Sequence, residues 1–100
     1  MVRAIKKGVY LDADRYEVFV DGRPRVLANA EFLMLKALLE AKGVVLSRRS
    51  LRNAACADAT GERSIDTHVC RIRAAIGKDK IVTVPHVGYK LPVSHHAKAR

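Results

Sequence analysis

The sequence predicts a single α+β domain in which an N-terminal antiparallel β-sheet precedes three helices and a C-terminal β-hairpin. Three observations support this prediction. Short β-branched and aromatic runs near the N-terminus flank the dipeptide Asp21-Gly22, which is a strong hairpin signal. Residues 62–76 repeat aliphatic side chains at the spacing of one helix face. A glycine-containing stretch, 81–91, follows that helix at once and has the pattern of a short hairpin.

The N-terminal part of the chain is predicted to form strands at residues 9–11, 16–20 and 25–27. The run 16–20 is rich in the β-branched and aromatic residues that favour extended backbone. Between the second and third of these strands, Asp21 and Gly22 can both take a positive φ, as a two-residue hairpin turn requires. We therefore expect an antiparallel sheet at the N-terminus.

Two helices are predicted next. Asn29 is a suitable N-cap for a helix that runs to about Lys42, with Gly43 as its C′ residue. The apolar residues of this helix cover more than one face, so we expect it to be the central helix. After an extended stretch at 44–46, Ser47 caps a second helix, and residues 57–61 form a loop. The inward residues of the second helix are Leu51, Ala54 and Ala55, and its outward residues are Arg48, Arg49 and Arg52.

The third helix, at residues 62–76, has one aliphatic stripe and one polar face. The stripe consists of Ile65, Val69, Ile72 and Ile76, which we expect to pack against Phe32, Leu35, Leu39 and Leu51. The opposite face carries Arg63, Thr67, Cys70, Arg71 and Ala74, with Ser64 at its edge. Gly77 ends this helix, and strands at 81–84 and 89–91 close the domain. This order of elements is that of a winged helix-turn-helix fold, with the hairpin as the wing.

The charge of the chain favours a polyanionic partner. Nineteen Lys and Arg against ten Asp and Glu give a formal net charge of +9. The arginines, short hydroxyls and small residues opposite the aliphatic stripe suit a DNA major groove. No apolar run approaches the roughly 20 residues of a membrane-spanning helix, so we do not expect a membrane partner.

The remaining composition sets the expected boundaries and location. One hundred residues suffice for one modest core, and we expect the domain to cover 1–93, with 94–100 as a basic, disordered tail. The N-terminus lacks the apolar region of a secretory signal. Two cysteines do not make a disulfide framework, so a reduced, cytoplasmic location is expected.

Four segments carry motifs in a fixed order: residues 27–32, 45–51, 63–73 and 83–91. The first reads Leu27-Ala28-Asn29-Ala30-Glu31-Phe32, and the third begins Arg63-Ser64-Ile65-Asp66-Thr67-His68-Val69. Together they resemble the DNA-binding effector domain of bacterial response regulators of the OmpR/PhoB class, over about residues 9–93. The resemblance implies a regulator of transcription that binds double-stranded DNA sequence-specifically. Helix 62–76 would then lie in the major groove and the wing, 81–91, near the backbone or the minor groove.

The chain departs from the family pattern in several places. Cys56 stands where the family usually has a tryptophan, and the loop after the second helix is short. Pro85-His86 stands in the wing where the family commonly has Arg-Gly, so the arginine that often enters the minor groove in the family is missing here. The sequence contains no receiver domain, and its starting methionine and early strand favour a free-standing module over a fragment. Without a receiver's dimer interface, we expect a monomer in free solution that pairs in tandem on DNA.

The resemblance and the polar face of the third helix together assign candidate DNA contacts. Base contacts are expected from Arg71, Thr67 and Ser64. Phosphate contacts are expected from Arg48, Arg49, Arg63, His68, Arg73 and Thr83, and the wing candidates are His86 and Lys90. Arg71 is expected to specify sequence, because a guanidinium matches guanine bidentately. The other arginines are expected to supply affinity through backbone phosphates.

Several of these residues also have a purely structural interpretation. His68 lies toward the edge of the helix, where a structural role fits equally well. Asp66 either orients a basic neighbour such as Arg71 or is an acid of the first turn that the helix dipole favours. The arginines of the second and third helices could be solvated surface charges. Tyr89 is expected in the core, because single-strand binders need several exposed aromatics.

Neither catalysis nor a metal or cofactor site is expected. Asp66, His68 and Cys70 are spaced by two and cannot share a helix face, and the chain has no Cys-x-x-Cys pair or phosphate-binding loop. Two alternatives to specific DNA binding remain. One is a protein-binding antagonist or adaptor that turns the winged-helix surface toward another regulator or RNA polymerase. The other is non-specific nucleic-acid binding through charge alone.

Overall fold

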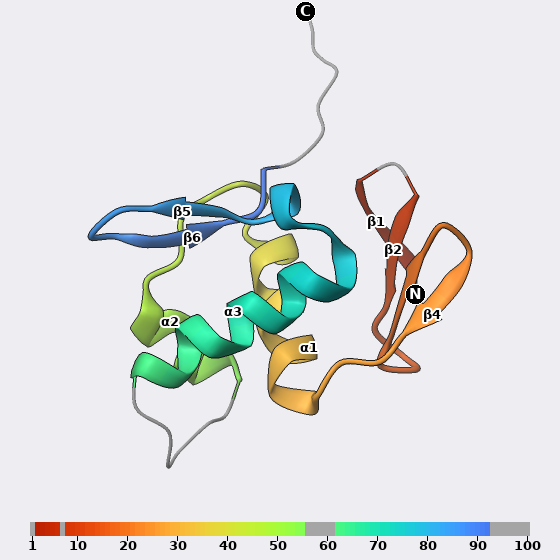
Figure 1. Cartoon of the computed structure of the whole chain (residues 1–100), viewed down its shortest axis with the longest axis horizontal. Helices are drawn as coiled ribbons and strands as arrows, with labels where there is room; N and C mark the ends of the chain where they lie inside the picture. Colours follow the sequence, from red (N-terminus) through yellow and green to blue (C-terminus); the bar gives the residue numbers. More distant parts are fainter. Residues whose placement is uncertain (1, 7, 56–61, 93–100) are drawn as a thin grey trace, which may run out of the picture.

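The computed structural model describes residues 2–6, 8–55 and 62–92, with side chains described for 8–55 and 65–92. Four strands come first: β1 (Val2–Lys6), β2 (Val9–Asp12), β3 (Glu17–Val20) and β4 (Arg23–Arg25). The helices are α1 (Asn29–Glu40), α2 (Arg48–Ala54) and α3 (Glu62–Ile76). A short 3-10 turn, η1 (Lys78–Lys80), precedes strands β5 (Val82–Val84) and β6 (Gly88–Lys90) (Figure 1). The predicted winged helix-turn-helix architecture is confirmed.

The N-terminal sheet is antiparallel and has the strand order β1-β2-β3-β4. At the β3–β4 turn Asp21 has a φ of 52° and Gly22 a φ of 82°, so the predicted two-residue hairpin is confirmed. The return strand was predicted at 25–27, which is two residues too late: β4 contains Pro24, and Val26 is 96% exposed. Proline fits β4 because an edge strand can leave one side without a ladder hydrogen bond. Strand β1, which pairs with β2, was not predicted.

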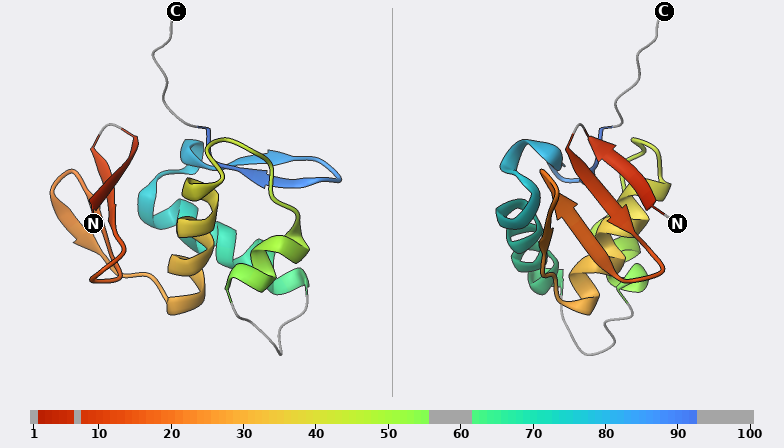
Figure 2. Two further views of the ribbon diagram at one scale, coloured as in Figure 1. Left: turned by 180° about the vertical axis from the view of Figure 1, so that it is seen from behind. Right: turned by 90° about the vertical axis from the view of Figure 1, so that its right-hand side faces the viewer.

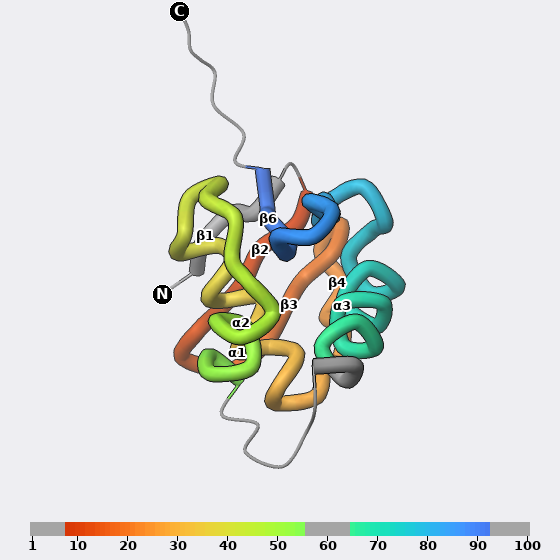
Figure 3. The backbone as a smooth tube through the Cα atoms, turned by 90° about the vertical axis from the view of Figure 1, so that its left-hand side faces the viewer, coloured from red at the N-terminus to blue at the C-terminus, as the bar shows by residue number. Residues whose placement is uncertain are grey.

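Helix α1 lies at the centre of the molecule. The four-stranded sheet lies on one side of it, and α2, α3 and the wing lie on the other (Figure 2). Viewed from the opposite side to the sheet, the strands of that sheet pass behind the helices (Figure 3). Side chains from every layer form one hydrophobic cluster, which includes Leu11 and Val18 of the sheet and Phe32 and Leu38 of α1. The prediction that this is the central helix is therefore confirmed.

The ends of α1 differ from the prediction by one or two residues. The N-cap is Ala28 and not Asn29, which is the first helical residue. Alanine offers no side-chain acceptor, and the cap is completed from the other side: the Glu31 carboxylate accepts the Ala28 N–H at 3.2 Å. At the other end the C-cap is Ala41, so Lys42, with a φ of 54°, takes the left-handed C′ position assigned to Gly43.

The other two helices follow the sequence closely. Ser47 caps α2, with its side-chain oxygen 3.1 Å from the N–H of Ser50. Helix α3 has the predicted bounds, 62–76, and ends at Gly77, whose φ is 120°. The aliphatic stripe of α3 and its expected partners are all buried in the one cluster: Ile65, Val69, Ile72, Ile76, Phe32, Leu35, Leu39 and Leu51. The facing assigned to α3 is therefore confirmed.

The wing is joined to the segment between α1 and α2. Strands β5 and β6 pair antiparallel, and each lies within a residue or so of its predicted bounds. Leu46 bridges Tyr89 through two backbone hydrogen bonds of 2.8 and 3.0 Å. Gly88 lies against this bridge so closely that a Cβ there would overlap the Leu46 carbonyl oxygen. The predicted loop at 57–61 and the predicted tail at 94–100 lie outside the described residues.

Candidate nucleic-acid interface

The face of α3 opposite its buried stripe is open to solvent. Thr67, Cys70, Arg71 and Ala74 are all exposed, while Ile65, Val69 and Ile72 on the other side have no exposed surface. Two of the three predicted base contacts, Arg71 and Thr67, therefore lie on one accessible surface. The side chains of Ser64 and Arg63, at the start of the helix, lie outside the described residues.

Arg71 is exposed but is not isolated. Its side chain is 67% exposed, and its Nη1 lies 3.7 Å from Oε2 of Glu31, a residue of α1. Arg71 therefore lies on the side of α3 that faces the start of α1, about 50° from the centre of the exposed face at 100° per residue. In this position the Arg71 side chain is largely exposed to solvent although it lies close to Glu31.

His68 lies on the same side of α3, one turn before Arg71. Its side chain is only 17% exposed, and its Nδ1 is 3.1 Å from Oε2 of Glu31. This burial favours the structural role for His68 that the sequence left open. A phosphate contact from His68 stays a prediction, and it would have to use the small exposed part of the ring.

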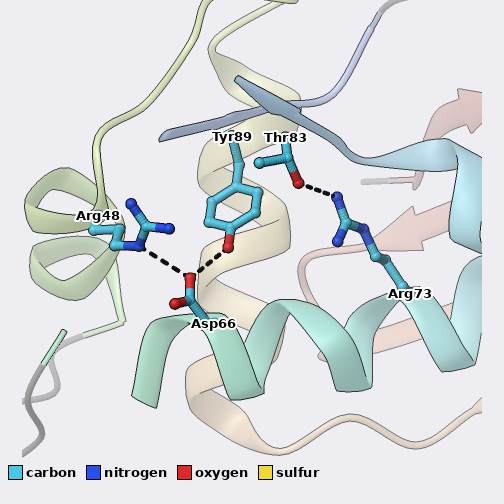
Figure 4. Close-up of polar contacts among 5 residues, drawn as sticks. All are labelled: Arg48, Asp66, Arg73, Thr83 and Tyr89. Carbon is cyan, nitrogen blue, oxygen red and sulfur yellow. Dashed lines mark hydrogen bonds and ion pairs between the residues drawn. The ribbon is translucent and has the colours of Figure 1, made fainter. Parts of the chain in front are cut away.

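A second polar cluster lies on the other side of α3, where Asp66 meets α2 and the wing (Figure 4). One carboxylate oxygen of Asp66, Oδ1, accepts a hydrogen bond from Arg48 Nε at 3.0 Å and another from the hydroxyl of Tyr89. Asp66 therefore orients a basic neighbour, as one of its two interpretations held, but that neighbour is Arg48 and not Arg71. Asp66 of α3 thus connects α2, through Arg48, with β6, through Tyr89.

The electrostatics of this cluster follow from the same contacts. The hydrogen bond from the Tyr89 hydroxyl is the largest influence on the Asp66 carboxyl and lowers its pKa. Burial, the next largest, raises this pKa, and the hydrogen bond and charge of the Arg48 guanidinium lower it again, so the pKa is lowered overall. Burial, and then the bond to Asp66, raises the pKa of the Tyr89 hydroxyl. The hydrogen bond to Asp66 and its charge raise the pKa of the Arg48 guanidinium, although Arg48 lies at the surface. At neutral pH the cluster is a carboxylate held between a guanidinium and a neutral phenol.

Arg73 ties α3 to the first strand of the wing (Figure 4). Its Nη2 donates to the Ile81 carbonyl at 2.9 Å and to Thr83 Oγ1 at 2.8 Å, and its Nε donates to the same carbonyl at 3.2 Å. Its guanidinium also lies 5.6 Å from the centre of the Tyr89 ring. Two of the predicted phosphate contacts, Arg73 and Thr83, are thus bonded to each other. Both assignments stay predictions, and the geometry favours a positioning role for Arg73.

The remaining candidate residues with described side chains lie on α2 and the wing. Arg49 is exposed in the first turn of α2, next to the half-exposed Arg48. On the wing, His86 is exposed at the turn with a φ of 66°, and Lys90 is half-buried on β6. Arg49, His86 and Lys90 lie on α2 and the wing, which flank α3 (Figure 1). Tyr89 is 5% exposed, so the prediction that it lies in the core is confirmed.

The sequence-based prediction missed the part that Glu31 takes in this interface. Glu31 belonged to a recognised motif but was not named as a site residue. The available signal was an acid at the third position of a helix, which typically caps that helix. The sequence around Glu31 gave no sign that His68 and Arg71 of α3 would lie against its carboxylate.

Other kinds of site receive little support from the described part of the chain. No group of three or more metal-ligating side chains is present among the residues described. No helix there is both long and apolar enough to cross a bilayer. Cys70 is exposed beside a shallow groove of about 300 Å³ that it lines with Arg73, Ala74 and Lys78, and Cys56 lies outside the described residues.

Known proteins are similar to this chain in sequence and in fold. CseB, a transcriptional regulatory protein of Streptomyces coelicolor, is 41% identical over 83 residues, which are 81% of this chain and 36% of CseB. The structure of DrrB, an OmpR/PhoB homologue of Thermotoga maritima, is 31% identical with a TM-score of 0.81, covering 91% of this chain and 44% of DrrB. The DNA-binding domain of Klebsiella pneumoniae RstA, solved in complex with the RstA box, is 24% identical with a TM-score of 0.76, covering 91% and 96% of the two chains.

The curated relatives are longer than the chain. It spans between 35% and 41% of the length of the curated relatives that it matches. A family model described as "Transcriptional regulatory protein, C terminal" matches residues 22–91, which include all three helices and both strands of the wing. Its members are transcription factors and not enzymes. The chain therefore belongs to the family of C-terminal effector domains of transcriptional regulatory proteins of the OmpR/PhoB type.

Proposed function

We propose that this domain binds double-stranded DNA sequence-specifically as part of a bacterial transcription regulator in the cytoplasm. One observation carries the proposal: α3 buries four aliphatic residues and leaves Thr67 and Arg71 exposed on a surface flanked by the wing and the start of α2. A helix with an accessible arginine and hydroxyl between two flanking elements has the form of a major-groove reader. The RstA domain, which shares the fold, was solved with its DNA box.

The proposed contacts divide by what each side chain can reach. In this proposal Arg71, Thr67 and Ser64 read base edges in the major groove. Phosphates are bound by Arg48, Arg49 and Arg63, with contributions from His68, Arg73 and Thr83 where their internal contacts leave donors free. His86 and Lys90 bring the wing close to the backbone or the minor groove. The net charge of +9 supplies the long-range attraction.

The two classes of contact are tested by comparing Arg71→Ala with Arg49→Ala, which remove the same side chain from two exposed positions. A cognate duplex is first selected from a random pool by the wild-type protein, and affinity for it and for a scrambled duplex is measured at two salt concentrations. Arg71→Ala should lower the cognate-to-scrambled ratio about 5- to 150-fold, the equivalent of ~1–3 kcal/mol of base discrimination.

Arg49→Ala should weaken both duplexes alike and reduce the salt slope by about one unit, because one phosphate contact is lost. Equal loss of the ratio in both variants, or no loss in Arg71→Ala, would mean that a different surface meets the bases. If the selection enriches no duplex and binding disappears with competitor DNA, the attraction is due to charge alone.

A second candidate function is docking on another protein, such as another regulator or RNA polymerase. The observation in its favour is the wing tip, where Val87 is 53% exposed and Pro85-His86 stands in place of the Arg-Gly pair common in the family. In a mobility-shift titration this candidate predicts little DNA binding at any salt concentration. Val87→Asp should then abolish binding to the partner protein, whereas the same change should leave DNA affinity unchanged if the domain acts by binding DNA.

We also propose that the domain is monomeric in free solution and pairs in tandem on DNA. Copies that each carry a charge of +9 repel one another, and DNA removes this repulsion by neutralising the charge. The molar mass from light scattering should therefore be that of one chain in the absence of DNA. With a duplex that contains two adjacent sites, it should be that of the duplex with two bound chains. A stable dimer without DNA would contradict this proposal.

A further inference from the structure

Glu31 is buried in a way that acidic side chains seldom are. Among the side chains that the structure describes, it is the only charged one that is buried, with 3% of its surface exposed. Removing a carboxylate from water is costly unless hydrogen bonds and opposite charges replace the solvent. The neighbours of this carboxylate therefore show what holds it.

Both oxygens of Glu31 have partners, and the partners come from two elements. Oε1 accepts the N–H of Ala28 at the start of α1. Oε2 lies 3.1 Å from Nδ1 of His68 and 3.7 Å from Nη1 of Arg71, both on α3. Glu31 also stands in the first turn of α1, where the helix dipole favours a negative charge. The capping bond and the burial fix this charge in place beneath the exposed guanidinium of Arg71.

We infer that Glu31 is a positioning residue for sequence readout: it orients the Arg71 guanidinium before DNA binds. The inference rests on the proposed function, in which Arg71 reads base edges. A guanidinium carries five N–H donors in a planar fork. Glu31 engages it at Nη1, and the side chain of Arg71 is 67% exposed, so donors remain for an acceptor outside the protein. His68, three residues earlier, forms part of the same support from the helix side.

This arrangement should raise selectivity more than affinity. An ion pair with an exposed arginine contributes little to stability, so its main effect is on the orientations open to the side chain. Ordering a long side chain at an interface is costly, and a side chain that is ordered beforehand avoids this cost. The carboxylate also offsets part of the positive charge of Arg71, which weakens attraction to any phosphate. Glu31 thus restricts the orientations of the Arg71 guanidinium before a base edge is bound.

The test is Glu31→Gln, which keeps the size and the acceptor for Ala28 but removes the charge that holds Arg71. We expect the cognate-to-scrambled affinity ratio to fall about 3- to 10-fold, the scale of one side chain's ordering cost. Affinity for the scrambled duplex should stay the same or rise. The matched control is Glu40→Gln, which makes the same charge change in the last turn of α1 and should leave the ratio unchanged.

A double-mutant cycle separates positioning from a general structural effect. In an Arg71→Ala background, Glu31→Gln should cause no further fall in the ratio, because the group that Glu31 orients is gone. An equal further fall in both backgrounds, or an unchanged ratio for Glu31→Gln alone, would overturn the inference. Thermal melts of all variants fix the temperature at which each is fully folded.

The inference can also be tested on the wild-type protein alone, by the mobility of the Arg71 side chain. NMR relaxation of the arginine side-chain N–H groups should show the Nε–H of Arg71 more restricted than that of Arg49, which is exposed on α2. Equal mobility of the two would overturn the inference even if Glu31→Gln failed to fold. If instead the wild-type protein selects no duplex, the proposed function fails, and the NMR result still reports on the contact with Glu31.

Discussion

Truncation of Ile72 to alanine tests the packing that exposes the polar face of α3. Ile72 has no exposed surface and lies in the middle of the stripe that packs into the core. The change removes roughly three buried carbons, and at about 0.8 kcal/mol each the lost burial alone amounts to about 2.4 kcal/mol. The residual cavity adds to this loss, so we expect a total of about 2–4 kcal/mol.

The assay is chemical denaturation with urea, followed by far-UV circular dichroism, together with a thermal melt. For a domain of 60–100 residues each kcal/mol corresponds to roughly 4–8 °C in Tm, so a fall of at least about 8 °C is expected. Ile72→Val removes one carbon and should cost only about 0.5–1.5 kcal/mol. Val44→Ala is the control for an exposed position, because Val44 is 64% exposed, and it should change stability by less than about 0.5 kcal/mol. A loss below about 0.5 kcal/mol for Ile72→Ala would refute the assigned facing of α3.

Three further predictions concern the N-cap of α2 and the contacts that connect α2, α3 and the wing. Ser47→Ala should lower the free energy of unfolding by about 1 kcal/mol in urea denaturation, because the cap of α2 is lost. Gly88→Ala should lower Tm sharply, since the new Cβ overlaps the Leu46 carbonyl; an unchanged melt would mean that the bridge does not form in solution. The Tyr89 hydroxyl holds the pKa of Asp66 below its ordinary value of 3.8, so the stability that Asp66 contributes is fully present above about pH 5 and is lost as the pH falls through the lowered native pKa. In Asp66→Asn, the free energy of unfolding should fall less between pH 6 and pH 2 than in the wild-type protein. An equal fall in both proteins would show that Asp66 does not form these bonds in solution.

The sequence predicted the elements whose signals are local. The period of α3, the cap at Ser47 and the turn at Asp21-Gly22 depend on neighbours within a few residues, and all three are confirmed. Strand β1 was missed because its strand character depends on pairing with β2 and not on its own composition. The end of α1 was misplaced by two residues because both Lys42 and Gly43 adopt a positive φ, and only the glycine has a strong preference for it.

The site was predicted less completely, because its contacts join residues far apart in sequence. The exposure of Thr67 and Arg71 follows from the helix period alone. The contacts of Arg73 with Ile81 and Thr83 do not follow from the helix period, because they depend on where β5 passes over α3. An arginine that pointed into solvent from the same position would have the same sequence pattern. The burial of Glu31 likewise depends on α3 crossing the start of α1.

The wing is fastened at its base to two other elements. Leu46 holds it through backbone bonds, and Arg73 holds it from α3. These contacts constrain the distance between the wing and the exposed face of α3. A DNA site whose two grooves are spaced differently has to bend or twist to fit, and the energy of doing so depends on its sequence. Such a domain would discriminate among base steps that it never touches.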